Sequence, residues 1–205
     1  MAEYLVVIRS GVTEFEVQGR IRGILDIPLS PEGFAEADSI AAILASDPPV
    51  AVCMANAPCA VETARVIGRT IGIKPRLLPE LTNLDLGLWQ GMLIEEIRRK
   101  QPRLARQWDE NPWSVVPPDG ESLSEACDRV ETSLQRMLRR HASGRVALVA
   151  PHPLDRVIRW IVAGDLMGDV WERDPLEPSV VCLPVSSQWK APARGRDRRL
   201  AASRP

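Results

Sequence analysis

Short runs of consecutive apolar residues, separated by patterns typical of helices, constrain the fold of this 205-residue chain most strongly. Four such runs cover residues 5–8, 50–54, 146–150 and 180–183, and a weaker one covers 76–78. A strand that is apolar on both sides is typical of a parallel sheet whose two faces are covered by helices. We therefore predict an α/β fold, a three-layer sandwich with a mostly parallel central sheet.

Amphipathic patterns between these runs predict helices over 31–47, 58–71, 122–140 and 154–166. The first of them begins after Ser30, a good N-cap, with Pro31 at the first helical position. Residues 79–121 are instead rich in glycine, proline and tryptophan, and hold only short helical stretches. We predict that this segment is a cap insertion over one edge of the sheet.

Composition and charge indicate a folded domain with a basic tail. Hydrophobic residues make up 45% of the chain and charged residues 26%, as in ordinary globular domains. We assign residues 1–189 to one domain and 190–205 to the tail, whose balance of +5 leaves −6 on the rest of a chain with net charge −1. An acidic body argues against a nucleic-acid partner. No apolar run approaches the ~18 residues of a membrane span, so no membrane partner is expected.

The cysteines indicate the redox compartment of the protein and whether it holds a metal. The four cysteines, at positions 53, 59, 127 and 182, show no paired short spacing, which argues against a zinc site and a disulfide framework. The first residues lack the pattern of a secretory signal. We expect a reduced, cytoplasmic protein that needs no metal and no cofactor.

Two strand ends carry the candidate functional residues. Arg9 and Ser10 follow the first apolar run, and His152 follows the run at 146–150. Ligands of parallel sheets bind at the carboxyl ends of the strands. We therefore expect these three side chains near one site.

Six segments, in order along the chain, are similar to motifs of the histidine phosphatase superfamily, in particular its phosphoglycerate-mutase-like branch. They are Val7-Ile8-Arg9-Ser10-Gly11-Val12-Thr13, Gly19-Arg20-Ile21-Arg22-Gly23, Asp26-Ile27-Pro28-Leu29-Ser30-Pro31-Glu32-Gly33, Glu62-Thr63-Ala64, Gly87-Leu88-Trp89-Gln90-Gly91 and Pro118-Asp119-Gly120-Glu121-Ser122. The resemblance implies a pocket in which a histidine attacks phosphorus and two arginines and a second histidine surround the phosphoryl oxygens. It also implies an acid from the cap that protonates the leaving oxygen, with no metal.

Only part of that catalytic set is present. By the resemblance, Arg9 and His152 are retained. Three positions are replaced, those of the nucleophilic histidine, the second arginine and the acid, and they hold Ser10, Cys59 and Asn83. The resemblance also places Arg20 at a position that contacts substrate in the family.

These replacements favour a protein that has lost phosphotransfer. In this interpretation Arg9, Arg20 and His152 bind a phosphorylated small molecule or a phosphoprotein, or the domain regulates or scaffolds a protein partner. A third class, a pure interaction protein, would need no phosphate site. A structural role for His152 in the core is an alternative to a ligand role.

The alternative is an active phosphomonoesterase or mutase with a rebuilt centre. Ser10 would then need His152 as its base. Cys59 and Arg65 have the Cys-x5-Arg spacing of cysteine-dependent phosphatases, although the residues between them favour a helix over a phosphate-binding loop. Glu80 or Asp85 would have to replace the acid.

Overall fold

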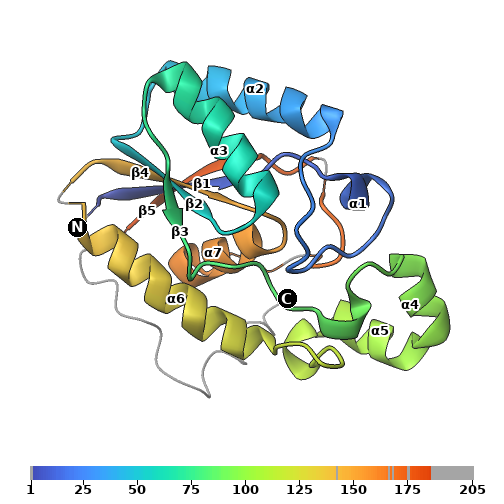
Figure 1. The fold of residues 1–205 in the computed structure, drawn as a ribbon. Coiled ribbons are helices and arrows are strands. Elements are labelled where there is room, and N and C mark those ends of the chain that lie inside the picture. The colour runs from blue at the N-terminus through green and yellow to red at the C-terminus, as the bar shows by residue number, and fades with distance from the viewer. Residues whose placement is uncertain (1, 142, 166, 168, 175, 186–205) are drawn as a thin grey trace.

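The central sheet has the predicted, mostly parallel arrangement. The computed structural model describes residues 2–141, 143–165, 167, 169–174 and 176–185 (Figure 1). Within these residues five strands form one sheet in the order β3-β2-β4-β1-β5. Their bounds are β1 Tyr4–Arg9, β2 Ala51–Ala55, β3 Arg76–Leu78, β4 Arg145–Ala150 and β5 Val180–Pro184. The first four pair in parallel and β5 pairs antiparallel with β1. The predicted tail at 190–205 lies outside the described residues.

Burial explains why the apolar runs form the middle of the sheet. Residues 5–9 of β1 and 146–150 of β4 are buried, and the two strands pair along their whole length. The apolar run of β5 predicted a strand without its direction. The strand lies at the edge of the sheet and runs antiparallel to β1, an arrangement that is common at the edge of an otherwise parallel sheet.

Helices cover both faces, as a three-layer sandwich requires. In Figure 1 α2 (Pro31–Ala45) and α3 (Pro58–Ile71) lie on one face, and α6 (Leu123–Arg139) and α7 (Leu154–Ala163) on the other. The prediction that the last helix reaches residue 166 is wrong. Gly164 takes a left-handed conformation, with φ 72°, and its N–H caps the Trp160 carbonyl, which ends α7 at Ala163.

The cap insertion lies beside the sheet, on the side toward which β1 runs (Figure 1). Its elements are η1 Gly87–Trp89, α4 Ile94–Lys100, α5 Pro102–Glu110 and η2 Pro112–Ser114. Backbone bonds from Gly91 to Ile21 and from Ile94 to Gly19 join the cap to the loop after α1 (Glu14–Val17). The cap is therefore held against the strand ends that carry the candidate site.

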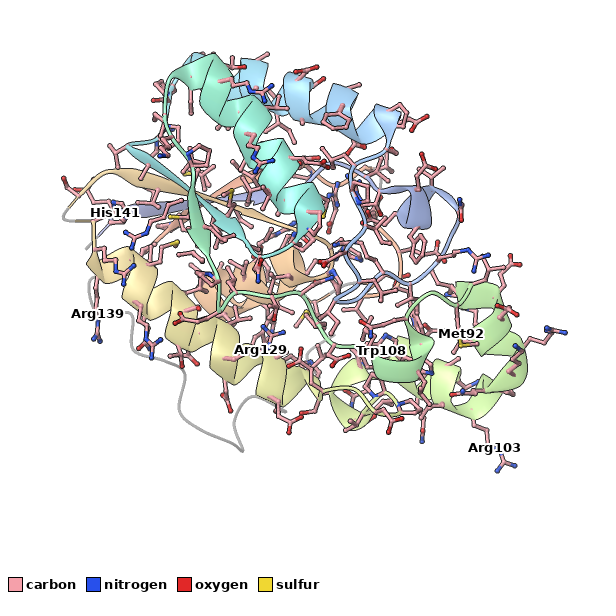
Figure 2. The ribbon with its side chains drawn as sticks, viewed as in Figure 1. Met92, Arg103, Trp108, Arg129, Arg139 and His141 are labelled. Carbon is pink, nitrogen blue, oxygen red and sulfur yellow. The ribbon has the colours of Figure 1, made fainter. Side chains whose placement is uncertain are left out.

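Three tryptophans pack together where the cap meets the residues that precede β5. Trp89 of η1, Trp108 of α5 and Trp171 have ring centroids 5.0–5.7 Å apart, and Trp108 is labelled in Figure 2. Aromatic pairs at such distances stabilise packing beyond the area they bury. This cluster holds Trp171 against the cap, and the charged residues Asp174 and Glu177 farther along the chain lie against Arg9 at the end of β1.

Candidate functional site

Parallel pairing of β1, β2 and β4 brings three predicted site residues to one edge. Ser10 follows β1, Cys59 lies in the first turn of α3 after β2, and His152 follows β4. The Ser10 hydroxyl donates to Cys59 Sγ at 3.5 Å. Asn83 joins them from the segment after β3, because its Nδ2 donates to the His152 carbonyl at 3.2 Å and to the Gly23 carbonyl at 2.8 Å.

Arg22 completes this group, which we call the strand-edge cluster (Ser10, Arg22, Cys59, Asn83 and His152). One terminal nitrogen of Arg22 lies 3.2 Å from Cys59 Sγ and the other donates to the His152 carbonyl at 2.9 Å. Sequence reasoning named Arg20 from the same loop and missed Arg22. The sequence did offer a clue to Arg22. Cys59 is shorter than the arginine that the resemblance implies at its position, and the space this leaves can hold the guanidinium of another arginine.

The strand-edge cluster is closed. Its five side chains belong to residues that are between 0% and 5% exposed. No carboxylate of the described residues lies within 4.0 Å of Arg22, so the guanidinium rests on neutral partners. The Ser10 hydroxyl and the Arg22 guanidinium both contact the Cys59 thiol, and Arg22 and the Asn83 amide both donate to the His152 carbonyl.

The retained Arg9 contacts residues that precede β5 and not the strand-edge cluster. Its guanidinium donates to the carbonyl of Glu177 at 3.0 Å and to that of Asp174 at 3.4 Å, and it lies 3.7 Å from the Glu177 carboxylate. None of its hydrogen bonds reaches the strand-edge cluster. Arg20 also points elsewhere, donating to the Gly91 carbonyl at 2.7 Å and to Gln18 at 3.2 Å.

Burial makes Cys59 a poor nucleophile. Removal from water raises the pKa of its thiol, an effect that the Arg22 charge and the Ser10 hydrogen bond only partly oppose. A cysteine phosphatase needs the thiolate. Cys59 also lies within the helix α3, as the residues after it predicted, and not in a phosphate-binding loop.

Asp155 supports His152 from α7. Its carboxylate lies 3.6 Å from His152 Nδ1. Burial alone would raise the pKa of Asp155, but the nearby His152 imidazole and the charges of Arg9 and Arg156 outweigh it, so the pKa is lowered. Asp155 is therefore ionised in the core at neutral pH.

A cavity of about 460 Å³ borders the cluster at Asn83. Its charged lining consists of three carboxylates, Asp26, Asp85 and Glu121, and one guanidinium, Arg129. Arg129, labelled on α6 in Figure 2, is already bound to Glu121 at 2.6 Å and to the carbonyls of Thr82 and Asn83. The lining of this cavity is thus net negative, which opposes binding of a phosphate there.

The carboxylates proposed as substitute acids are both engaged. Asp85 accepts from the Gly87 N–H at 2.9 Å and from Gln90 at 3.2 Å. Glu80 forms an exposed ion pair with Arg136 at 3.5 Å. Among the described residues there is no group of three or more histidine, cysteine or acidic side chains that could hold a metal, and no helix suited to crossing a membrane.

Comparison with known proteins decides the family. The profile of the histidine phosphatase superfamily (branch 1) matches residues 5–182. The chain belongs to the histidine phosphatase superfamily. It is 30% identical over 146 residues to phosphoserine phosphatase 1 of Hydrogenobacter thermophilus, covering 71% of this chain and 69% of that protein. It is 31% identical over 149 residues to phosphoglycerate mutase-like protein 4 of Arabidopsis thaliana, covering 71% of this chain but only 64% of the relative.

Solved structures agree with this assignment. The vanadate-complexed mycobacterial glucosyl-3-phosphoglycerate phosphatase superposes with a TM-score of 0.72 at 26% identity, over 77% of this chain and 80% of that one. YhfR of Bacillus stearothermophilus superposes with a TM-score of 0.78 at 23% identity, over 91% and 93% of the two chains, and supports the fold alone. The profile match over residues 5–182 includes every residue of the strand-edge cluster.

Thiol labelling checks the closure of the cluster. In the native protein we expect only Cys182 to react with an aromatic disulfide reagent, because Cys53, Cys59 and Cys127 are buried and Cys182 is exposed. All four cysteines should react in denaturant. Peptide mapping assigns the labelled thiol, and Cys182→Ser is the control that should leave the native protein unlabelled. Rapid native labelling of Cys59 would contradict a closed cluster.

Acid unfolding checks the charge on Asp155. Its folded-state pKa lies below the ordinary value of 3.8, so its stabilising contribution is complete above that value and is lost as the pH falls through it. We expect Asp155→Asn to lower the free energy of unfolding by about 1–3 kcal/mol at pH 7. The variant should also lose less stability than the unmodified chain between about pH 5 and about pH 3. Urea titrations at several pH values measure both effects. An equal dependence of the free energy of unfolding on pH in the two proteins would contradict an ionised Asp155.

Proposed function

We propose that this chain is a pseudoenzyme of the histidine phosphatase superfamily. It acts by binding, as a regulatory or scaffolding protein, and transfers no phosphoryl group. The observation that carries the proposal is the closed strand-edge cluster, in which Ser10 donates to the Cys59 thiol and the Asn83 amide donates to the backbone carbonyl of His152. Its ligand is a phosphorylated small molecule, a phosphoprotein or another protein partner.

The nucleophile position supports this proposal. The Ser10 hydroxyl donates to the Cys59 thiol, and neither ring nitrogen of His152 has a hydrogen-bond partner among the described residues. A serine hydroxyl attacks phosphorus only when a base takes its proton. No ring nitrogen of His152 is hydrogen-bonded to Ser10, so the serine has no base beside it in this structure.

The acid position supports it as well. Asn83 has no proton to give at neutral pH, and its amide is fixed by two carbonyls. A phosphomonoester needs protonation of the leaving oxygen for fast cleavage. The negatively charged lining of the cavity beside Asn83 is also unfavourable for a phosphomonoester.

The free thiols fit a reducing compartment, and we place the protein in the cytoplasm as part of this proposal.

A second candidate is an active phosphomonoesterase with a rebuilt centre. It is favoured by the cavity beside Asn83, where the Asp85 carboxylate stands in the lining, and by relatives that are named phosphatases. It requires Asp85 to leave Gly87 and Gln90 and the buried cluster to open.

A phosphatase assay separates the two candidates. We expect the purified chain to release no phosphate above the buffer rate from p-nitrophenyl phosphate, phosphoserine and a panel of sugar phosphates. Ser10→Ala should behave like the unmodified chain, as should Ser39→Ala, the matched control on α2. Saturable turnover that disappears in Ser10→Ala but survives in Ser39→Ala would overturn the proposal.

A further inference from the structure

A large groove lies outside the strand-edge cluster and is lined by none of its five residues. We call it the α2 groove. It has a volume of about 1250 Å³ and is bordered by α2, the residues from the end of β1 to Arg20, the start of α4, and the residues from Trp171 to the start of β5. Pockets that enclose a small molecule usually measure about 300–1,000 Å³. The volume of the α2 groove therefore favours a segment of a polymer over a metabolite.

One face of α2 forms a wall of the α2 groove along most of the helix. The α2 residues in the lining are 32, 35, 36, 39, 40 and 43, and this spacing of three and four places them on one side of the helix. From 32 to 43 the helix rises by about 16 Å, a length that about five residues of an extended peptide cover. Ala35 and Ser39, in the middle of the wall, are short and exposed, so they leave room for a peptide backbone.

Apolar side chains supply much of the remaining lining. Ile43, at one end of the wall, is 60% exposed. Further apolar residues line the groove from the β1–α1 loop, the cap and the start of β5: Val12, Leu93, Ile94, Pro178 and Val180. Covering such surface with the apolar side chains of a ligand is favourable, because it removes both from water.

The charged lining of the α2 groove is net negative. Its five glutamates and three arginines, a balance of −2, are Glu16, Glu32, Glu36, Glu95, Glu172, Arg9, Arg20 and Arg173. Glu36 pairs with Arg173 at 2.9 Å, and Glu172 is 3.5 Å from a cap arginine. Among the described residues, no cation lies within 4.0 Å of the carboxylates at 16, 32 and 95. These three carboxylates favour a ligand that carries positive charge.

Buried donors in the same lining lack a hydrogen-bond partner among the described residues. They include Nε1 of Trp171, a residue that is only 8% exposed, and one terminal nitrogen of Arg173. An indole or guanidinium N–H can only donate, so each of these groups needs an acceptor such as a carbonyl oxygen. The α2 groove therefore combines carboxylates that need cations with donors that need acceptors.

We propose that the α2 groove binds an extended, basic segment of a partner protein. Lysine or arginine side chains of that segment pair with Glu16, Glu32 and Glu95, and its backbone carbonyls accept from Trp171 and Arg173. A small anion offers acceptors but is repelled by the carboxylates, and a polyamine offers cations but no acceptor. The inference goes beyond the proposed function, because the groove would bind this segment whether or not the strand-edge cluster transfers phosphate.

The direction of β5 favours a partner protein over the C-terminal residues of this chain as the occupant. Val180, the first residue of β5, lines the α2 groove. Since β5 runs antiparallel to β1, Pro184 pairs with Tyr4 at the opposite edge of the sheet. The described part of the chain therefore ends at the edge of the sheet that lies away from the groove.

Fluorescence anisotropy of a labelled peptide tests the proposal. The probe is a rhodamine-labelled octapeptide of four Lys-Leu repeats, which when extended places its cations on one side and its leucines on the other. We expect the full chain to bind this peptide saturably and not to bind the matched octapeptide of four Glu-Leu repeats. No saturable binding of the Lys-Leu peptide, or equal binding of the two peptides, overturns the proposal.

Two double variants of equal charge separate the α2 groove from the general acidity of the chain. Glu32→Gln with Glu95→Gln removes two carboxylates from the lining, whereas Glu3→Gln with Glu110→Gln removes two exposed carboxylates outside it. We expect the first pair to weaken binding of the Lys-Leu peptide by about fivefold, because exposed ion pairs each contribute little. The second pair should match the unmodified chain. Equal weakening by both pairs overturns the groove as the binding site.

A steric pair of variants tests the same site without a change of charge. Ser39→Trp fills the middle of the wall, whereas Ala42→Trp places the same side chain on α2 outside the lining. We expect Ser39→Trp to weaken binding by about tenfold or more, because the indole takes the space of the peptide, and Ala42→Trp to leave it unchanged. Binding that survives Ser39→Trp overturns the proposal.

A competition experiment distinguishes the two sources of a basic segment. The competitors are the unlabelled Lys-Leu peptide and a peptide with the sequence of residues 190–205. We expect the Lys-Leu peptide to displace the probe at the lower concentration. The reverse order would make the C-terminal residues of this chain the occupant and would overturn the assignment to a partner protein.

Discussion

The parallel pairing of β1 with β4, and of β4 with β2, is the constraint on which the site depends. It brings Ser10, Cys59 and His152 to one edge, although they are separated by most of the chain. In a catalytic member of the superfamily this edge would hold a phosphoryl group between cationic side chains. Here the Arg22 guanidinium lies against Cys59 and the His152 carbonyl, and the edge is filled by the protein's own groups.

Much of the architecture could be predicted from the sequence, because buried strands and amphipathic helices have patterns that packing does not override. The strands at 5–8 and 146–150 and the helix at 58–71 are confirmed. The antiparallel direction of β5 could not be predicted, since an apolar run has the same pattern in either direction. The end of α7 was placed too late, although Gly164 is a usual helix terminator.

The site was harder to predict than the fold, because motif positions do not say where long side chains point. Ser10 and His152 lie near one another, as their strand ends predicted, and Cys59 and Asn83, which the family resemblance indicated, lie with them. The long side chains differ: Arg22 enters the cluster, whereas Arg9 turns to the segment before β5. Nothing in the sequence indicated that Glu177 would pair with arginines. Arg9, Arg156 and Arg159 come within 4.0 Å of its carboxylate only when the chain folds.

A pseudoenzyme, as proposed above, would transfer no phosphoryl group at the strand edge, whatever its ligand. Oxygen-isotope exchange tests it without knowledge of a substrate, because an enzyme that forms a phosphoryl intermediate also exchanges the oxygens of inorganic phosphate with water. The chain is incubated with isotopically labelled phosphate and the label is followed by phosphorus NMR. We predict that the phosphate keeps its label for as long as it does in buffer. Loss of label at a rate proportional to protein concentration, and absent in Ser10→Ala, would contradict the account.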